Sequence, residues 1–534
     1  MREENEQPRP GARAGSRGSL ARPSATLSAP TLADTLSPNV LRTLTAADLA
    51  AFLVKRRWFG AKAGAPRETR VRDVVALPWE GGHFAVARLD VVSADGTATS
   101  YQLPLCVRSV EEIGDAPPAG IIARVSTTQG EGLLFDAVED GAFLRALTDA
   151  FAKPQTIERG GTRWVIEPIG AKALVVPATA NVSVGSAEQS NTSIVIDELA
   201  ILKLFRKLES GEHPEVELTR FLTVDMGFAH TPVLLGVIRF EDDAGSTVAA
   251  MLQEYLPKSV DAWRFALERS RGYFAEAKGE PQNNFLAEAE RLGSITREMH
   301  DALARGTSPD LAPEQVTERH LERWARDAHR WIEGSLMLLD RQLTAKGLPK
   351  ARVAEADALL RRRSHYDASV DEIMRTLGGD AGLAIRIHGD YHLGQVLRTA
   401  RDDFMIIDFE GEPARSLAER RQKASPLRDV AGMLRSFAYA AATLGMEAKT
   451  LDVPTRELRV ARWERDTREA FLRGYLGEGQ GNGNRFPLPA FLSHIRALLR
   501  LFETEKAFYE LAYELNNRPD WAWIPMRGIA KLMA

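Results

Sequence analysis

Two neighbouring stretches of the chain decide the fold: His388-Gly389-Asp390-Tyr391-His392-Leu393-Gly394-Gln395 and Ile406-Ile407-Asp408-Phe409-Glu410-Gly411. Phosphoryl transfer to a hydroxyl group needs a carboxylate within hydrogen-bond reach of the attacking oxygen. It also needs oxygen ligands for a Mg²⁺ ion that bridges the nucleotide phosphates. Asp390 suits the first task. Gln395 and Asp408 suit the second, because Mg²⁺ prefers hard oxygen donors. The two stretches therefore predict a kinase whose chemistry lies between Asp390 and Asp408.

The spacing within these stretches carries the prediction. An aspartate, an amide residue five positions later and an apolar strand ending in aspartate resemble the catalytic loop and metal-binding aspartate of the protein-kinase-like superfamily. The alternative is a turn with ordinary surface acids, and a lone His-Gly-Asp would favour it. The apolar strand leading into Asp408 argues against that alternative. We expect His388 to brace the loop through hydrogen bonds rather than to transfer protons.

One lysine upstream matches the needs of a bound nucleotide. Lys203 is the single cation in the apolar run 199–205, which we predict to be a strand. From a strand of this kind, a lysine can reach the α- and β-phosphates. Glu217, on a predicted helix over 212–223, is the expected partner of Lys203, with Glu215 as the rival. The alternative is a lysine whose stem lies along the surface and a solvated glutamate.

The usual glycine-rich phosphate loop, Gly-x-Gly-x-x-Gly, does not occur in the sequence. A polar segment stands where such a loop would lie, and hydroxyl, amide and backbone N–H groups can also cap phosphate oxygens. The alternative is a polar hairpin loop. The absence of a Walker A sequence argues against a P-loop kinase. We predict nucleotide contacts from this segment and, for the adenine edge, from the junction after the strands: Gln189, Ser190, Asn191, Thr192, Ser193, Gln253 and Tyr255.

Composition limits the class of protein. The 534 residues carry a formal net charge of -4, with 44% hydrophobic and 27% charged residues. These values are ordinary for a folded protein and give no bulk electrostatic case for nucleic acid or an acidic membrane surface. No run of eighteen apolar residues occurs, and the single cysteine, Cys106, cannot form an intramolecular disulfide. We therefore predict a cytoplasmic protein with no membrane span.

The order of predicted elements divides the chain into four parts. Residues 1–40 are poor in large apolar side chains and are expected to form a disordered arm. Residues 41–152 alternate in the manner of short strands and are expected to form a β-rich domain, with a helix from Thr45 to Arg57 capped by Thr45. Residues 153–256 are expected to form a β-rich nucleotide-binding lobe. Residues 257–534 are predicted to form a helical lobe that carries the catalytic and acceptor-binding residues.

With these residues in view, the chain resembles the maltokinase family over nearly its whole length beyond the arm. The resemblance implies an α+β, bilobal, aminoglycoside-phosphotransferase-like fold, with an N-terminal cap domain matching the predicted β-rich domain. It also implies the phosphorylation of maltose by ATP to give maltose 1-phosphate for α-glucan synthesis. Asp390 would then be the base, Gln395 and Asp408 would hold Mg²⁺, and association with trehalose synthase, as a monomer or homodimer, is open. The matching segments are 57–62, 188–193, 388–397, 408–413, 419–437 and 506–525.

The acceptor residues are predicted from the needs of a disaccharide, which is polar but has flat faces. Tyr509 and Tyr513 are four residues apart on a predicted helix and so share one face. The alternative is that this tyrosine pair packs into the core. We predict an acceptor site composed of the tyrosine pair, the groups that follow it and those that flank the catalytic residues: Tyr391, His392, Glu410, Arg415, Tyr509, Tyr513, Glu514 and Arg518.

Other functions are compatible with the same sequence. Catalytic residues act on the phosphate and not on the acceptor, so a kinase of glucosamine, another sugar or an aminoglycoside has the same motifs. A non-catalytic module would lack Asp390, Asp408 or Lys203, and all three are present. We also expect Asp429 to cap a helix and brace the catalytic loop, and Trp58 to be a core residue.

Overall fold

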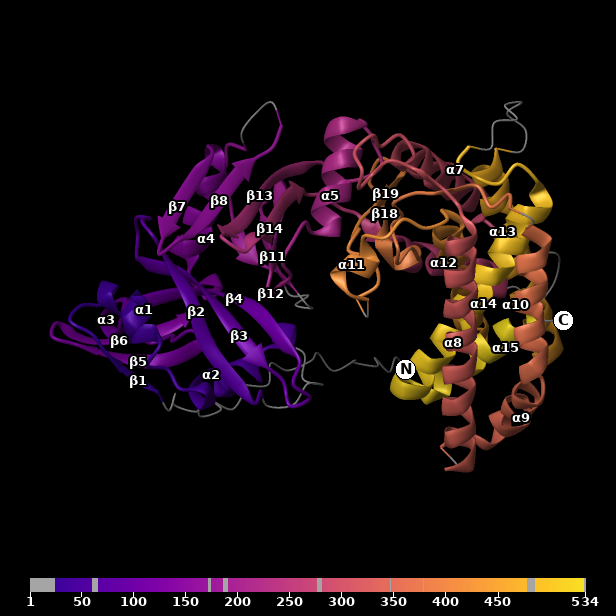
Figure 1. The fold of residues 1–534 in the computed structure, drawn as a ribbon, viewed down its shortest axis with the longest axis horizontal. Coiled ribbons are helices and arrows are strands. Elements are labelled where there is room, and N and C mark those ends of the chain that lie inside the picture. The colour runs from indigo at the N-terminus through magenta and orange to yellow at the C-terminus, as the bar shows by residue number, and fades with distance from the viewer. Residues whose placement is uncertain are drawn as a thin grey trace, which may run out of the picture.

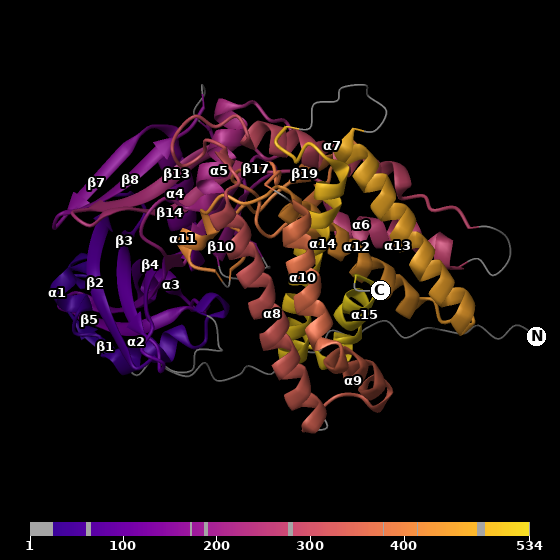
Figure 2. The same ribbon diagram turned by 45° about the vertical axis from the view of Figure 1, so that its right-hand side comes forward.

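The computed structural model describes residues 25–59, 66–170, 174–185, 191–275, 281–345, 347–377, 379–413, 415–477 and 486–532. Figure 1 shows three units: an N-terminal sheet domain at the lower left, a second sheet above it, and a helical lobe on the right. Figure 2 shows the second sheet again above the N-terminal sheet domain, with the helical lobe to the right. The predicted α+β architecture with an N-terminal β-rich domain is confirmed.

The first unit is a seven-stranded sheet in the order β1-β5-β6-β4-β3-β2, with β12 paired to β4. Helix α2, Ala46–Leu53, packs on it through Leu49, Phe52 and Leu53, which are buried. Thr45 caps this helix in a reciprocal arrangement with Asp48, as predicted. Trp58 is buried, as expected of a core residue. The strands are β1 Thr26–Ser28, β2 Glu68–Leu77, β3 His83–Val92, β4 Ala98–Ser109, β5 Ile121–Thr127, β6 Gly130–Asp136 and β12 Lys207–Leu208.

The prediction of a disordered arm over residues 1–40 is wrong for its last part. Strand β1 pairs in parallel with β5, and Leu27 and Leu36 are buried in the core of the sheet domain. Helix α1, Pro38–Leu41, also begins before residue 41. The segment has few apolar side chains, but Ala25, Leu27 and Leu36 are buried, and Leu32 and Val40 pack against the same core. Residues 1–24 lie outside the described residues.

The second unit is a seven-stranded sheet in the order β7-β8-β13-β14-β11-β10-β9. Lys203 lies in the middle of β11, opposite Ser193 of β10 and Met251 of β14. Helix α5, Pro214–Arg220, follows β11 and faces the third unit (Figure 1). The strands are β7 Gln155–Arg159, β8 Thr162–Pro168, β9 Val182–Val184, β10 Asn191–Ile196, β11 Ala200–Phe205, β13 Leu234–Asp242 and β14 Gly245–Glu254.

The third unit is helical. Its long helices pack around one large apolar core. Residues 353–377 form two helices that meet at Arg362. No helix in the described part of the chain is long and apolar enough to cross a membrane. The helices are α6 Ala262–Ala275, α7 Leu286–Leu303, α8 Glu318–Thr344, α9 Val353–Arg361, α10 Arg363–Leu377, α11 Leu417–Arg420, α12 Leu427–Glu447, α13 Val453–Leu476, α14 Leu492–Asn517 and α15 Trp523–Leu532.

Short strands frame the catalytic segment inside this unit. The catalytic segment lies between two short strands, β17, Leu383–Ala384, and β18, Val396–Arg398. Between them the chain forms a loop, because side chains from neighbouring helices satisfy its backbone groups instead of a strand. β18 pairs with β19, Phe404–Ile406, which leads directly to Asp408.

Candidate active site

A buried carboxylate holds the loop that carries Asp390. Asp429, in the first turn of α12, accepts hydrogen bonds from the backbone N–H groups of His388 at 2.8 Å and Gly389 at 2.9 Å. His300 of α7 lies 3.1 Å from the same carboxylate. Burial acts to raise the pKa of Asp429, but these hydrogen bonds and the nearby histidines outweigh it and lower the pKa. The predicted bracing role is confirmed. The predicted cap is not, because α12 begins without a side-chain cap.

His388 links the catalytic loop to the segment of Asp408. Its Nε2 lies 2.9 Å from the carbonyl oxygen of Ile407, and a carbonyl only accepts, so Nε2 carries the proton. The unprotonated Nδ1 then faces the backbone N–H of Asp390 at 3.4 Å. With both ring nitrogens engaged in this way, the imidazole is a structural brace. This agrees with the role predicted for His388.

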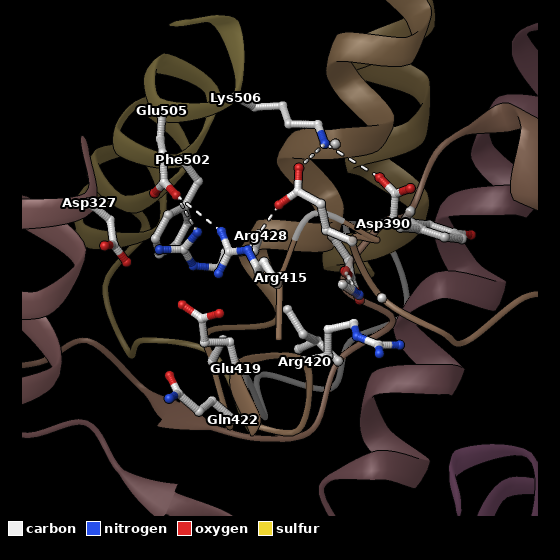
Figure 3. Close-up of a pocket in the computed structure, with 18 of the residues that line it drawn as sticks. Asp327, Asp390, Arg415, Glu419, Arg420, Gln422, Arg428, Phe502, Glu505 and Lys506 are labelled. Atoms are coloured by element: carbon white, nitrogen blue, oxygen red, sulfur yellow. Dashed lines mark hydrogen bonds and ion pairs between the residues drawn. The ribbon is translucent and has the colours of Figure 1, made fainter. Parts of the chain in front are cut away.

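Asp390 has a cationic neighbour that the sequence reasoning missed. The ammonium of Lys506, on α14, lies 3.4 Å from Asp390 Oδ1 and 3.7 Å from Glu412 Oε1 (Figure 3). Burial would lower the pKa of Lys506, but the two carboxylates reverse this and raise it, so the lysine stays charged. The available signal was spacing: Lys506 precedes Tyr509 by three residues and therefore shares its helix face.

Asp408 follows β19 in the third unit and faces Lys203 of the second sheet. Their charged groups are 3.6 Å apart, and the side chain of Gln395 donates a hydrogen bond to Asp408. Asp408 has a φ of 70°, a left-handed backbone conformation that costs free energy in a residue with a side chain. Burial acts to raise its pKa, but Lys203 and the other neighbours hold the pKa below its usual value. The structure thus brings together three of the predicted residues, Lys203, Gln395 and Asp408.

The partner of Lys203 is Glu215, and the prediction of Glu217 is wrong. The Lys203 ammonium is ion-paired with Glu215, whose side chain is 1% exposed. Glu217 instead binds two arginines of the helical lobe: Arg386 Nη1 at 2.5 Å and Arg421 Nη2 at 2.8 Å. Positions two apart on a helix point roughly 200° apart, so the two glutamates cannot serve the same cation. Sequence order alone did not reveal which of them faces the cleft.

The predicted phosphate-binding residues separate into three groups. Gln189 and Ser190 lie outside the described residues. Thr192 is fully buried, and its hydroxyl accepts a hydrogen bond from Arg206, so this side chain points away from the cleft and the prediction is wrong for it. Asn191 faces the cleft, where its amide donates to Glu410 Oε1 at 2.8 Å. Ser193 lies opposite Lys203 in the sheet.

At the junction after β14, the backbone is already partly paired. The N–H of Glu254 donates to Val233 at 2.9 Å, and the N–H of Tyr255 donates to Leu199 at 3.2 Å. The Gln253 side chain is buried within β14. A base bound here would therefore meet carbonyl groups rather than these two N–H groups. The adenine contacts predicted at Gln253 and Tyr255 are therefore limited to backbone carbonyl groups.

Two cavities adjoin the catalytic loop, and Gly432, Lys506 and Tyr509 line both. The first contains Asp390 and a set of charged side chains, several of which appear in Figure 3. The second is bounded by aromatic rings and passes beside His392. Tyr513 is 47% exposed, so the alternative that it packs into the core is excluded. The aromatic residues that line the second cavity are Trp263, Tyr439, Tyr509, Tyr513 and Trp521.

Two predicted acceptor contacts are modified by the structure. Tyr391 borders the first cavity, but its ring is 2% exposed and its hydroxyl lies 2.9 Å from that of Thr296. Its side chain therefore belongs mainly to the core. Glu514 borders the second cavity, but its carboxylate is already bound by Arg518 at 2.6 Å and by Tyr439 at 3.1 Å. The Glu514 carboxylate orients these two side chains and is not free to accept a hydrogen bond from a sugar.

Three other acids around the cavities are also paired with arginines. Glu412 is bound by Arg415 at 2.9 Å, and Glu505 by Arg428 at 2.9 Å. Glu510 binds Arg435 at 2.6 Å and 2.9 Å. The predicted acceptor residue Arg415 therefore lines the first cavity as part of an ion pair. Glu410, also predicted there, instead lies with Asn191, Lys203 and Asp408 on the nucleotide side.

These features define a class of protein. A strand lysine paired with a helix glutamate, a catalytic-loop aspartate and a second aspartate after a short hairpin occur together between two lobes, as in protein-kinase-like enzymes. The chain is therefore a kinase-like phosphotransferase of small molecules with an added N-terminal sheet domain.

Known proteins agree with this class. Residues 52–140 match the model of the maltokinase N-terminal cap domain, which confirms the resemblance for this domain. Glucosamine kinase of Mycolicibacterium smegmatis is 27% identical over 65% of the chain and 78% of its own length, and that of Streptacidiphilus jiangxiensis is 25% identical over 65% and 72%. A solved structure of a glucosamine kinase with glucosamine, ADP and inorganic phosphate shares the fold, with a TM-score of 0.64, 19% identity, and coverage of 93% of this chain and 99% of that one.

Proposed function

We propose that this protein is an ATP-dependent maltokinase that transfers the γ-phosphate of ATP to the anomeric hydroxyl of maltose. Asp390 accepts the proton of the attacking hydroxyl, and the ammonium of Lys506 lies 3.4 Å from its carboxylate. Lys203, held by Glu215, contacts the nucleotide phosphates. Asn191 and Ser193 border the same space from β10.

The donor set on the nucleotide side fits Mg²⁺. It consists of oxygen groups alone, and the carboxylates of Glu215, Asp408 and Glu410 approach within 4.8 Å of one another. Asp408 and Gln395 would hold the ion, which when bound neutralises charge on the phosphates. Asp408 is suited to this because its low pKa keeps it ionised, and Gln395 orients its carboxylate through a hydrogen bond.

The observation that supports a neutral disaccharide is the charge state of the acceptor side. Each carboxylate of Glu412, Glu505, Glu510 and Glu514 is paired with a cation of the protein, and Lys506 stands beside Asp390. An amino sugar would bring an ammonium beside the partly buried ammonium of Lys506, and Glu419, which lines the first cavity without an ion pair to any described cation, already accepts hydrogen bonds from Ser416. Neutral hydroxyl groups, in contrast, can bond to these oriented charges, and the rings of the second cavity can stack on a second sugar ring.

Glucosamine is the second candidate, because the curated relatives and the solved structure with this fold are glucosamine kinases. The two candidates are separated by measuring phosphorylation of maltose, glucose, glucosamine and an aminoglycoside with ATP and Mg²⁺. We expect kcat/KM to be highest for maltose. A higher kcat/KM for glucosamine would refute the maltokinase proposal while preserving the catalytic roles.

The cellular setting follows from this proposal. Maltose 1-phosphate is a donor for α-glucan synthesis in the cytoplasm, and trehalose conversion supplies maltose, so association with trehalose synthase is part of the proposal. Co-purification of the two proteins tests it, and size-exclusion chromatography with light scattering distinguishes a monomer from a homodimer.

A further inference from the structure

A third cavity lies in the helical lobe, on the other side of α12 from the aromatic cavity. It has a volume of about 500 Å³ and lies between α12, α13 and α15, with Arg352 at the start of α9 on its rim. None of the residues that line it lines either cavity at the catalytic loop. Figure 2 shows α9 and α15 together on the side of the lobe away from the cap domain. The cavity is therefore separate from the proposed active site.

Charged side chains line the cavity, and Glu355, which does not line it, pairs with Arg352 and Arg527. Two carboxylates also line it, Glu457 and Glu464, and they are bound by Arg527 at 3.3 Å and by Lys531 at 2.7 Å. More cations than carboxylates thus face the cavity, which favours an anion. The five cations are Arg352, Arg435, Arg456, Arg527 and Lys531.

Two of these cations have capacity left for a ligand. Arg456 makes no side-chain hydrogen bond or ion pair with any described residue. Arg435 is 3% exposed and uses Nε and Nη2 to bind Glu510, while Nη1 has no partner among the described residues. Its guanidinium lies against Gly528, where an added Cβ would come within 2.3 Å of Nη1. Glycine at this position therefore leaves the space that the guanidinium occupies beside the cavity.

The remaining walls are apolar. Ala438, Ala442 and Ile524 line the cavity, and the Trp523 ring lies 5.1 Å from the guanidinium carbons of both Arg352 and Arg527. A free inorganic ion would leave these walls without contacts. A phosphate group on a small organic body would place its charge at the arginines and its body against the apolar wall.

We infer that this cavity binds a phosphate monoester of a small metabolite, such as a sugar phosphate, and thereby modulates the acceptor site. The link is the buried Arg435–Glu510 ion pair, because Arg435 lines the third cavity while Glu510 lines the aromatic one. A phosphate that binds Arg435 competes with Glu510 for the same guanidinium and loosens an acceptor-site side chain. The effect on the acceptor rests on the proposed function, whereas binding itself does not.

Calorimetric titration of the full chain, without nucleotide, tests the binding. Glucose 6-phosphate, inorganic phosphate and glucose are the probes. We expect glucose 6-phosphate to bind most tightly, and the double variant Arg456→Gln/Arg527→Gln to weaken it by about tenfold or more through loss of charged hydrogen bonds. The matched control is Arg465→Gln, on the same helix α13, because Arg465 is exposed, pairs with Asp466 and does not line the cavity.

Three results would overturn the inference: no binding of glucose 6-phosphate, equal affinity of the double variant and the control, or equal affinity for inorganic phosphate and the ester. Thermal unfolding of each variant establishes that it is folded. In the kinase assay, glucose 6-phosphate should raise KM for the acceptor severalfold and leave KM for ATP unchanged. If the protein proves not to phosphorylate maltose, the titration still decides whether the cavity binds the ester.

Discussion

The nucleotide side and the acceptor side of the cleft are organised differently. On the nucleotide side, a single ammonium, that of Lys203, lies among carboxylates from both lobes, and the carboxylate of Asp429 holds the backbone of the catalytic loop. On the acceptor side, Glu412, Glu510 and Glu514 each bind a cation of the protein, and aromatic side chains line the second cavity. The difference indicates that the first region is arranged to hold phosphate and metal, and the second to hold a neutral ligand. Substitutions should therefore separate catalysis from acceptor choice.

The largest effect is expected for Asp390→Asn. Loss of the general base should reduce kcat by roughly 10²–10⁴-fold, because an amide cannot take the proton of the hydroxyl. The nucleotide site does not include Asp390, so ATP affinity, measured by calorimetry, should change little. Full activity of this variant would refute the assignment of the base.

Glu217→Gln and Glu215→Gln are matched variants two residues apart on α5. Glu217→Gln should lower the free energy of unfolding by about 3–5 kcal/mol, because it leaves buried Arg386 without a counter-charge. Glu215→Gln should raise KM for ATP, since Lys203 loses its orienting charge. Thermal unfolding and initial-rate kinetics of both variants measure the two effects. The opposite outcome, a nucleotide defect confined to Glu217→Gln, would restore the pairing predicted from sequence.

Asp429 should make stability depend on pH. Its pKa is lower in the folded protein than in the unfolded chain, so its contribution is present above the unfolded value of about 3.9 and is lost as pH falls through the folded value. Asp429→Asn should therefore be less stable at neutral pH and should lose less stability on acidification. Chemical denaturation at a series of pH values measures this. Parallel stability curves for the two proteins would contradict it.

Lys506→Met tests whether the acceptor side of the cleft favours a neutral ligand. Removing this partly buried ammonium should raise relative activity toward glucosamine, because the repulsion between two ammonium groups disappears. The measurement is the ratio of kcat/KM for glucosamine to that for maltose, which should rise by about tenfold. An unchanged ratio would show that Lys506 does not select the acceptor.

The smallest effect is expected for Tyr513→Ala. Tyr513 is half exposed and lines the aromatic cavity, so its loss should raise KM for maltose severalfold and leave KM for ATP unchanged. Because few contacts hold this ring, thermal stability should hardly change. Equal KM values for maltose in both proteins would remove Tyr513 from the acceptor site.

Local sequence determined the elements whose signals lie within a few residues. The capped helix after Thr45, the strand that carries Lys203 and the spacing from Asp390 to Asp408 were all predictable, because capping, alternation and loop chemistry act over short distances. Matching segments also indicated the cap domain, which the family comparison confirms for residues 52–140. The last part of the arm was missed, because its strand depends on a partner that begins about ninety residues later, at β5.

Only the tertiary structure decided which charges meet. Glu215 rather than Glu217 binds Lys203 because the helix that carries both is rotated by its packing between the lobes, and no local pattern encodes this rotation. Likewise, Lys506 reaches Asp390 across 116 residues of sequence, and Asp429 reaches the catalytic loop across 40. Ion pairs depend on distance in space, whereas the sequence shows only which residues are available. The sequence therefore supplied the kinase chemistry, and the packing of α12 and α14 against the catalytic loop shaped the acceptor site.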